Sequence, residues 1–176
     1  VGPHTEDAIT LTNYYAFSKY AGELAACCVP STILRTNFVG KSKISNRESL
    51  TDWVYNSVAK KQQVQVLSDV YFSPLSMPVL AEMIETVVER RPLGTFNLGS
   101  RDGMSKADFD FAFAECLNLP TDSMTRVKTS EAKFLKAYRP RDMRMDCTKF
   151  EEVMKIRLPS LRELIEQMAK EYDEIT

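Results

Sequence analysis

The sequence predicts an α/β fold whose strands pair largely in parallel, and two observations lead to this prediction. Short runs of apolar and β-branched residues alternate with longer segments in which apolar residues recur every three or four positions. No internal repeat, low-complexity tract or strong linker divides the chain. Strands separated by helices are typical of parallel sheets, because parallel pairs need long crossover connections.

The first half of the chain contains two predicted helices and two predicted strands. Leu50, Val54 and Val58 are four residues apart, which places them on one helix face. Two short segments are rich in β-branched and apolar residues, STILRT and VQVL, and are therefore predicted to be strands. In order, the elements are a helix over 12–28, a strand over 31–36, a helix over 49–60 and a strand over 64–67.

The second half continues the alternation. A helix over 79–88 ends before Pro92 and Gly94, and a strand over 95–98 (TFNL) follows. Ser105 is a suitable N-cap for the next helix, with Asp108 three residues further on. A short strand is predicted over 124–127. The helix over 79–88 and the helix after Ser105 are expected to turn apolar residues to the core. These are Leu80, Met83, Ile84 and Val87 in the first, and Phe109, Ala112, Phe113 and Cys116 in the second.

The last helix has a clear start signal. Ser160 and Glu163 have the spacing of a capping box, directly after Pro159. The apolar stripe that follows consists of Leu161, Leu164, Ile165 and Met168. Two polar loops are predicted over 42–47 and 129–144, and loops of this length often line a site.

Composition excludes several classes of protein. The 176 residues suffice for one compact core, and the formal net charge of −1 gives no broad attraction to nucleic acid or to a membrane surface. No apolar run approaches the length of a membrane span. The four cysteines form no CxxC pair, so we predict no metal site and expect buried, reduced thiols in a cytoplasmic protein.

The chain begins at Val1, without a methionine, and continues directly into the loop-like residues Gly2-Pro3-His4. This start leads us to expect a fragment or a processed product.

The informative motif is Tyr15-x-x-x-Lys19 in the first predicted helix. Residues four apart on a helix are separated by about 40° around its axis, so both side chains project together. The apolar stripe of the same helix falls on the opposite side, and we expect it to face the core. It consists of Phe17, Ala21, Leu24 and Cys28.

A phenol beside an ammonium group suits acid/base chemistry on a carbonyl or an alcohol. Tyrosine normally ionises near pH 10, and a nearby lysine cation favours the phenolate. Such a phenol can exchange a proton with a carbonyl/alcohol couple while hydride moves. By itself the motif is a weak signal, because a solvent-exposed pair on an amphipathic helix fits equally well.

Several further segments resemble the extended short-chain dehydrogenase/reductases, and above all the dTDP-4-dehydrorhamnose reductase family. The resemblance runs in order along nearly the whole chain and implies the C-terminal part of a Rossmann-type sheet plus a smaller α/β substrate-binding region. It rests on Pro3–Glu6, Tyr15–Glu23, Ile33–Gly40 (ILRTNFVG), Val64–Pro74 (VQVLSDVYFSP), Leu80–Glu82, Gly94–Gly99 (GTFNLG), and Arg139-Pro140 through Asp146–Lys149.

The resemblance implies roles for five residues. Tyr15 would be the catalytic acid, and Lys19 would bind the nicotinamide ribose of NAD or NADP and assist Tyr15. Asn37 and Phe38 would face the substrate, a nucleotide-linked sugar, although both could equally be packing or strand-end residues. Arg139 would reach a nucleotide phosphate, since guanidinium suits such contacts, or else form a loop salt bridge.

The sequence departs from the family in one respect. None of its six glycines forms the glycine-rich turn that holds a dinucleotide pyrophosphate. We therefore expect residues 1–40 to be the end of the Rossmann-type half and residues 41–176 to be the substrate-binding region, without a sharp boundary. We also expect this chain alone to bind NAD(P) poorly and to be inactive, and to form a homodimer or pair with a missing N-terminal half.

Three functions remain open at this point. The first is 4-keto reduction of a nucleotide sugar by an NAD(P)-dependent enzyme, and the second is epimerisation or dehydration, since those enzymes share the Tyr/Lys pair. The third is partner binding without catalysis, as in the regulatory subunit of methionine adenosyltransferase, which this chain resembles at three places. These are Gly94-Thr95-Phe96, Met104-Ser105-Lys106 and Asn118-Leu119-Pro120.

Overall fold

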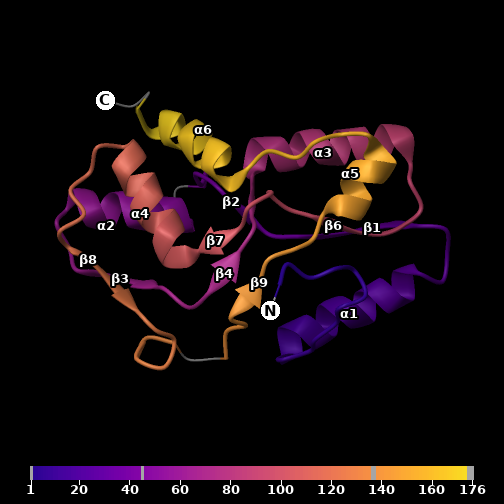
Figure 1. Cartoon of the computed structure of the whole chain (residues 1–176), viewed down its shortest axis with the longest axis horizontal. Helices are drawn as coiled ribbons and strands as arrows, with labels where there is room; N and C mark the ends of the chain where they lie inside the picture. Colours follow the sequence, from indigo (N-terminus) through magenta and orange to yellow (C-terminus); the bar gives the residue numbers. More distant parts are fainter. Residues whose placement is uncertain (1, 45, 136–137, 174–176) are drawn as a thin grey trace.

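A computed structural model describes residues 2–44, 46–135 and 138–173 (Figure 1). Residues 45 and 136–137, which belong to the two predicted loops, lie outside the described residues. Helices and strands alternate as follows: α1 (Tyr14–Ala26), β1 (Thr32–Thr36), β2 (Phe38–Val39), α2 (Leu50–Ala59), β3 (Val64–Leu67), β4 (Tyr71–Phe72), β5 (Leu75–Ser76), α3 (Met77–Arg90), β6 (Gly94–Leu98), β7 (Met104–Ser105), α4 (Lys106–Cys116), β8 (Met124–Val127), β9 (Asp142–Met143), α5 (Thr148–Met154) and α6 (Leu161–Asp173).

The strands form small sheets that are mostly parallel. β1 pairs with β6 in parallel from Thr32 opposite Gly94 to Thr36 opposite Leu98, and β3 pairs with β8 in the same sense. The short strand β2 pairs in parallel with β5, and β4 lies between an antiparallel β7 and a parallel β9. The predicted α/β class with largely parallel pairing is confirmed.

The core lies where α2, α4 and α6 pack together beside β3. The whole apolar stripe predicted for the last helix is buried, and Phe109 and Phe113 of α4 are completely buried with it. The capping box at Ser160 is present as predicted. Ser49 and Asp52 form a second box that begins α2, and Ser105 caps α4. In α2, α4 and α6, the residues that cap the helix and the apolar face that it buries therefore both support the same helix.

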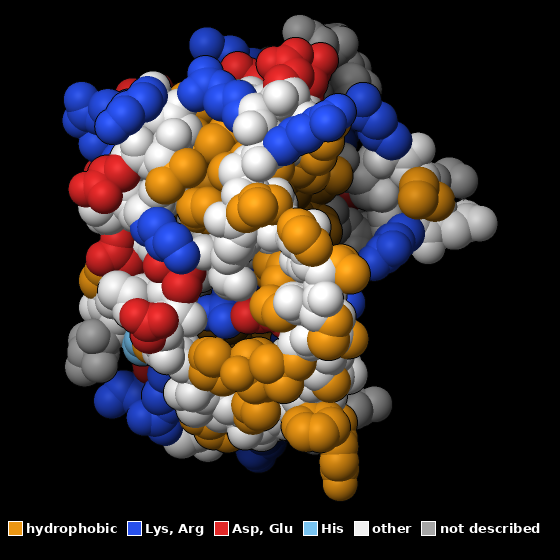
Figure 2. Space-filling view, turned by 90° about the vertical axis from the view of Figure 1, so that its right-hand side faces the viewer, with side chains coloured by type: hydrophobic (Ala, Val, Ile, Leu, Met, Phe, Trp, Pro, Cys, Tyr) orange, Lys and Arg blue, Asp and Glu red, His pale blue; other side chains and the backbone are white. Residues whose placement is uncertain are grey.

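The first helix departs from expectation. We predicted that its apolar stripe faces the core, but no residue of α1 is buried, and Phe17 and Leu24 are 61% and 54% exposed. Figure 2 shows hydrophobic side chains gathered in the lower part of the view, where α1 lies. The helix instead turns Ala16, Tyr20 and Glu23 inward, because Glu23 forms an ion pair with Arg35 of β1.

Other differences are smaller. The sequence did not predict the two-residue strands, one of which lies in the predicted loop 129–144, nor the short helix α5. Ile84 is exposed, whereas its predicted companions on α3 are buried. The expectation of buried thiols is wrong for Cys27, Cys28 and Cys116 and right for Cys147. Within the part of the chain that the structure describes, no helix is long and apolar enough to span a bilayer.

Candidate active site

Tyr15 and Lys19 lie together at the start of α1. The side chain of Asn13 caps this helix by accepting a hydrogen bond from the N–H of Ala16 at 2.8 Å. Tyr15 is 70% exposed, and the Lys19 ammonium lies 5.5 Å from the centre of its ring. The two side chains therefore share one open face, as the spacing predicted, and a ligand can approach both.

Lys19 also lines a hollow of about 220 Å³ between α1 and the preceding segment 8–11. Arg35 of β1 closes its inner side. The guanidinium donates to both carboxylate oxygens of Glu23 and to the backbone carbonyl of Glu6. These contacts hold the helix and the N-terminal segment against the sheet, which fixes the position of the Tyr/Lys face.

Asn37 and Phe38 follow the carboxyl end of β1, on the side of the molecule where α1 begins (Figure 1). The carbonyl of Asn37 accepts from the N–H of Leu75, and its side-chain oxygen is buried with no donor among the described residues. Phe38 is 58% exposed at the start of β2. In parallel α/β sheets, ligands bind beyond the carboxyl ends of the strands, so this is a favourable place for substrate contacts.

Arg139, the fifth predicted residue, lies in a different hollow. This cavity of about 380 Å³ is bounded by α2, β3, α4 and the loop before β9. Two cations, one carboxyl group and two aromatic side chains are among its lining residues, which are Leu50, Trp53, Gln65, Val66, Leu67, Lys106, Asp110, Phe134, Leu135 and Arg139.

The cavity contains two unusual ionisable groups that the sequence analysis missed. Burial raises the pKa of Asp110 to about 7, and the charge of Lys106 opposes this shift only in part. Burial lowers the pKa of Lys106; Asp110 opposes that shift and nearby Arg139 adds to it. The Lys106 ammonium lies 5.6 Å from the centre of the Phe72 ring. Perturbed groups in a cavity are typical of functional sites.

One sequence signal could have identified this pair. Lys106 and Asp110 are four residues apart at the start of α4, so they project on one side of the helix. Asp110 stands between Phe109 and Phe113, which are both completely buried. A charged residue in so strongly buried a part of a helix is uncommon unless it is paired or functional.

One wall of the cavity offers backbone hydrogen-bonding groups. The N–H of Val64 donates to the carbonyl of Ser123, just before β8, and the N–H of Ser68, just after β3, donates to the carbonyl of Val127, at 2.9 Å in each case. Because a parallel strand alternates the direction of its backbone groups, those of Gln65 and Leu67 point away from β8. Both residues line the cavity, and no other strand of the described chain pairs with this edge of β3.

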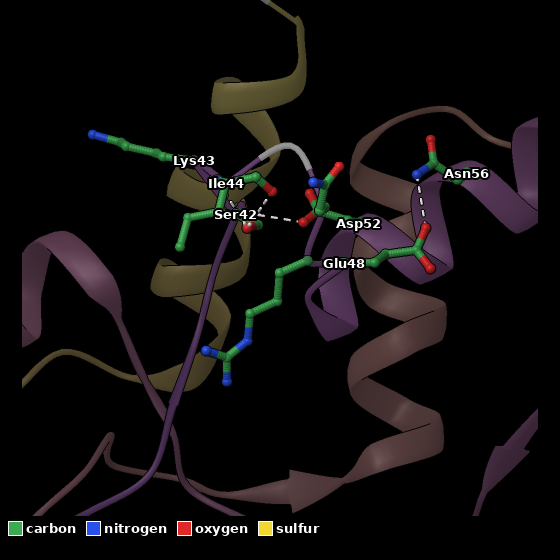
Figure 3. A pocket seen from close by; sticks show the side chains of 8 residues that line it. Ser42, Lys43, Ile44, Glu48, Asp52 and Asn56 are labelled. Carbon is green, nitrogen blue, oxygen red and sulfur yellow. Dashed lines mark hydrogen bonds between the residues drawn. The ribbon is translucent and has the colours of Figure 1, made fainter.

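A larger, open hollow of about 570 Å³ lies between the loop after β2 and α2 (Figure 3). Its central carboxylate, Asp52, is already occupied. It accepts from the N–H of Ser42, from the N–H and hydroxyl of Ser49, and from the hydroxyl of Tyr172. These bonds fasten the loop and α6 to α2, so we assign this hollow a structural role.

Comparison with known families identifies the family of the chain. The sequence matches the family described as RmlD substrate binding domain over residues 3–174. The chain belongs to this family. No significant match is found among curated protein sequences.

Solved structures agree with the assignment to the RmlD substrate-binding family. A dTDP-4-dehydrorhamnose reductase from Clostridium acetobutylicum superposes with a TM-score of 0.85 at 19% identity, covering 98% of this chain and 61% of that one. The reductase from Bacillus anthracis, in complex with NADP, gives 0.83 at 21%, covering 92% and 57%. A dTDP-glucose 4,6-dehydratase from Bacillus anthracis, in complex with NAD, gives 0.80 at 12%, covering 99% and 57%.

At these identities the likeness is one of fold. The RmlD-type domain described here spans about three fifths of the length of the first two reductases. The predicted resemblance to the dTDP-4-dehydrorhamnose reductase family and the predicted fold class are confirmed. The roles of Tyr15, Lys19, Asn37, Phe38 and Arg139 stay predictions.

Proposed function

We propose that the chain is the substrate-binding part of an NAD(P)-dependent reductase that acts on the 4-keto group of a nucleotide-linked sugar. The observation that carries this proposal is the open Tyr15–Lys19 face at the start of α1, within an RmlD substrate binding domain. The family match favours reduction over epimerisation, dehydration or partner binding without catalysis.

The chain's own residues would supply the proton. The Tyr15 phenol donates its proton to the carbonyl oxygen, which becomes the alcohol, and the phenolate that remains is stabilised by the Lys19 ammonium. Phe38 and Asn37 would bound the sugar on the other side. The reduced nicotinamide supplies the hydride to the carbonyl carbon when it is bound.

The described residues fit only one end of that cofactor. Lys19 presents donors that suit the hydroxyls of the nicotinamide ribose, beside the exposed Tyr15. The glycines of the described chain form no strand-to-helix turn of the kind that holds a pyrophosphate. Poor binding of NAD(P) by this chain alone therefore stays our expectation, as does a cytoplasmic location, where such cofactors are available.

The cavity beside β3 suits the nucleotide portion of the substrate. Its aromatic and aliphatic walls accept a flat base, and the unpaired backbone groups of Gln65 and Leu67 can read the edge of that base. Arg139 at its exposed rim suits a diphosphate, because a guanidinium matches phosphate oxygens in pairs. The substrate would then extend from this cavity to Tyr15.

The test is turnover by the complete gene product. We expect NADPH consumption, followed at 340 nm, only when dTDP-4-dehydrorhamnose or a related keto-sugar nucleotide is present. Tyr15→Phe should lower kcat about 100- to 10,000-fold, the contribution of a positioned general acid. Tyr14→Phe is the matched control, because Tyr14 is the adjacent exposed tyrosine on the same helix, and neighbouring residues of a helix project about 100° apart. Equal activities of the two variants, or no keto-sugar reduction by the wild type, would refute the proposal.

A further inference from the structure

Asp110 has no role in the chemistry described above. Its side chain is 2% exposed, it lines the cavity beside β3, and no described residue donates a hydrogen bond to its buried oxygen Oδ1. A buried polar group without a partner costs roughly 1–3 kcal/mol. A ligand or an ordered water that enters the cavity completes the hydrogen bonds of such a group.

The surroundings of Asp110 favour the neutral acid. Its own helix contributes Lys106, which lies beyond ion-pair distance, and the loop before β9 contributes Arg139. The other two walls present uncharged side chains to the cavity, Gln65 from β3 and Trp53 from α2. Desolvation outweighs the attraction of the lysine and raises the pKa of Asp110 to about 7.

A neutral carboxyl group holds a donor and an acceptor side by side. The O–H donates and the carbonyl oxygen accepts, about as far apart as a ring N–H and the adjacent carbonyl of uracil or thymine. An ionised carboxylate has only acceptors and repels such a carbonyl. The two protonation states of Asp110 therefore differ in their ability to pair with this base.

We propose that the protonated carboxyl group of Asp110 pairs with the donor–acceptor edge of a uracil or thymine base held in the cavity beside β3. This inference rests on the proposed function, because it assigns the cavity to the nucleotide of the substrate. Lys106 and Arg139 provide positive charge for the diphosphate of the same ligand.

Ligand binding should then depend on the proton of Asp110. If only the protonated protein binds well, the apparent affinity falls with the protonated fraction, which drops about tenfold between pH 6 and pH 8 for a pKa near 7. Asp110→Asn tests this directly, since a side-chain amide also presents a donor beside an acceptor but does not titrate.

The experiment is calorimetric titration of the 176-residue chain with UDP-glucose at pH 6, 7 and 8. The diphosphate of this probe is esterified at both ends, so it does not titrate in this range. We expect about tenfold weaker binding at pH 8 than at pH 6 for the wild type. Asp110→Asn should bind with little change over the same range, and Asp110→Leu should bind weakly throughout. Pyrophosphate, which has no base, is the control at pH 6, where Asp110 of the wild type is mostly protonated and uncharged; it should bind all three proteins with the same affinity there.

Two results would overturn the inference, and they can be told apart. If the wild type and Asp110→Asn respond identically to pH, or if Asp110→Leu binds as tightly as the wild type, Asp110 does not pair with the base and the proposed function stands. If no folded variant binds UDP-glucose at any pH, the nucleotide cavity itself is refuted, and this part of the proposed function fails with it.

Discussion

Asp142 is held by a dense set of hydrogen bonds around the end of the N-terminal segment. Arg144 donates to both of its carboxylate oxygens, at 2.9 and 2.7 Å, and the N–H of Gly2 donates at 2.8 Å. The guanidinium also lies 5.0 Å from the centre of the Tyr71 ring. The Arg144 hydrogen bonds are the main reason that the pKa of Asp142 lies well below its ordinary value, although partial burial acts against them.

Asp142→Asn should therefore destabilise the chain in a pH-dependent way. At pH 7 we expect a loss of about 1.5 kcal/mol, the lower end for hydrogen bonds to charged groups because the pair is partly exposed. A depressed pKa contributes stability above the unfolded value of about 3.8, and this contribution is lost as pH falls through the folded value. Urea unfolding at pH 7, 5 and 3 should show the difference shrinking at pH 3.

Asp122→Asn is the control for that series, because Asp122 is an exposed aspartate. It should match the wild type at every pH. An Asp142→Asn penalty that is as large at pH 3 as at pH 7 would mean that packing, and not the charge of the carboxylate, stabilises this corner.

At the scale of elements, the sequence correctly predicted the helices and strands that depend on interactions between neighbouring residues. The capped helices and the longer strands were predicted because caps, apolar stripes and β-branched runs are patterns of residues close together in the sequence. The two-residue strands were missed, since so short a segment has no periodicity and forms only when a partner strand arrives. The shared face of Tyr15 and Lys19 was predicted for the same local reason, through their helical spacing, whereas their catalytic roles stay predictions.

The misses at the site have a tertiary cause. Asp110 looks like an ordinary helix residue in sequence, and only the packing of α4 against β3 and α2 buries it in a cavity. The stripe of α1 was assigned to the core because a helix normally buries its apolar face. Which face is covered depends on the surfaces available, and here Arg35 pairs with Glu23 on another face.

The last helix provides a test of capping. Ser160 donates to Glu163 and accepts from its N–H, while Glu163 accepts from the N–H of Ser160 at 2.7 Å. Ser160→Ala removes the side-chain half of this box and should lower the free energy of unfolding by about 1 kcal/mol. Urea unfolding at pH 7 measures it, with Ser130→Ala on an exposed turn as the control. Equal stabilities of the two variants would show that packing of the buried stripe alone positions α6.

At the scale of the whole molecule, one side is apolar and has an open sheet edge. Phe17, Leu24 and Val29 are exposed on and after α1, and Figure 2 shows this surface. β1 pairs only with β6 within the described chain, so its second edge can accept another strand. Exposed apolar patches and open strand edges favour association.

We therefore expect the 176-residue chain to associate with itself as its concentration rises, because contact between copies removes this apolar surface from water. Size-exclusion chromatography with light scattering should show a mass that grows between micromolar and hundred-micromolar protein. The double variant Phe17→Glu with Leu24→Glu should remain monomeric over the same range, because burying two unpaired carboxylates in a contact between copies costs free energy. Val153→Glu, at an exposed apolar position of α5, should associate like the wild type. A wild-type chain that stays monomeric throughout would contradict this expectation. It would mean that the exposed apolar face of α1 is stable in water and does not cause self-association.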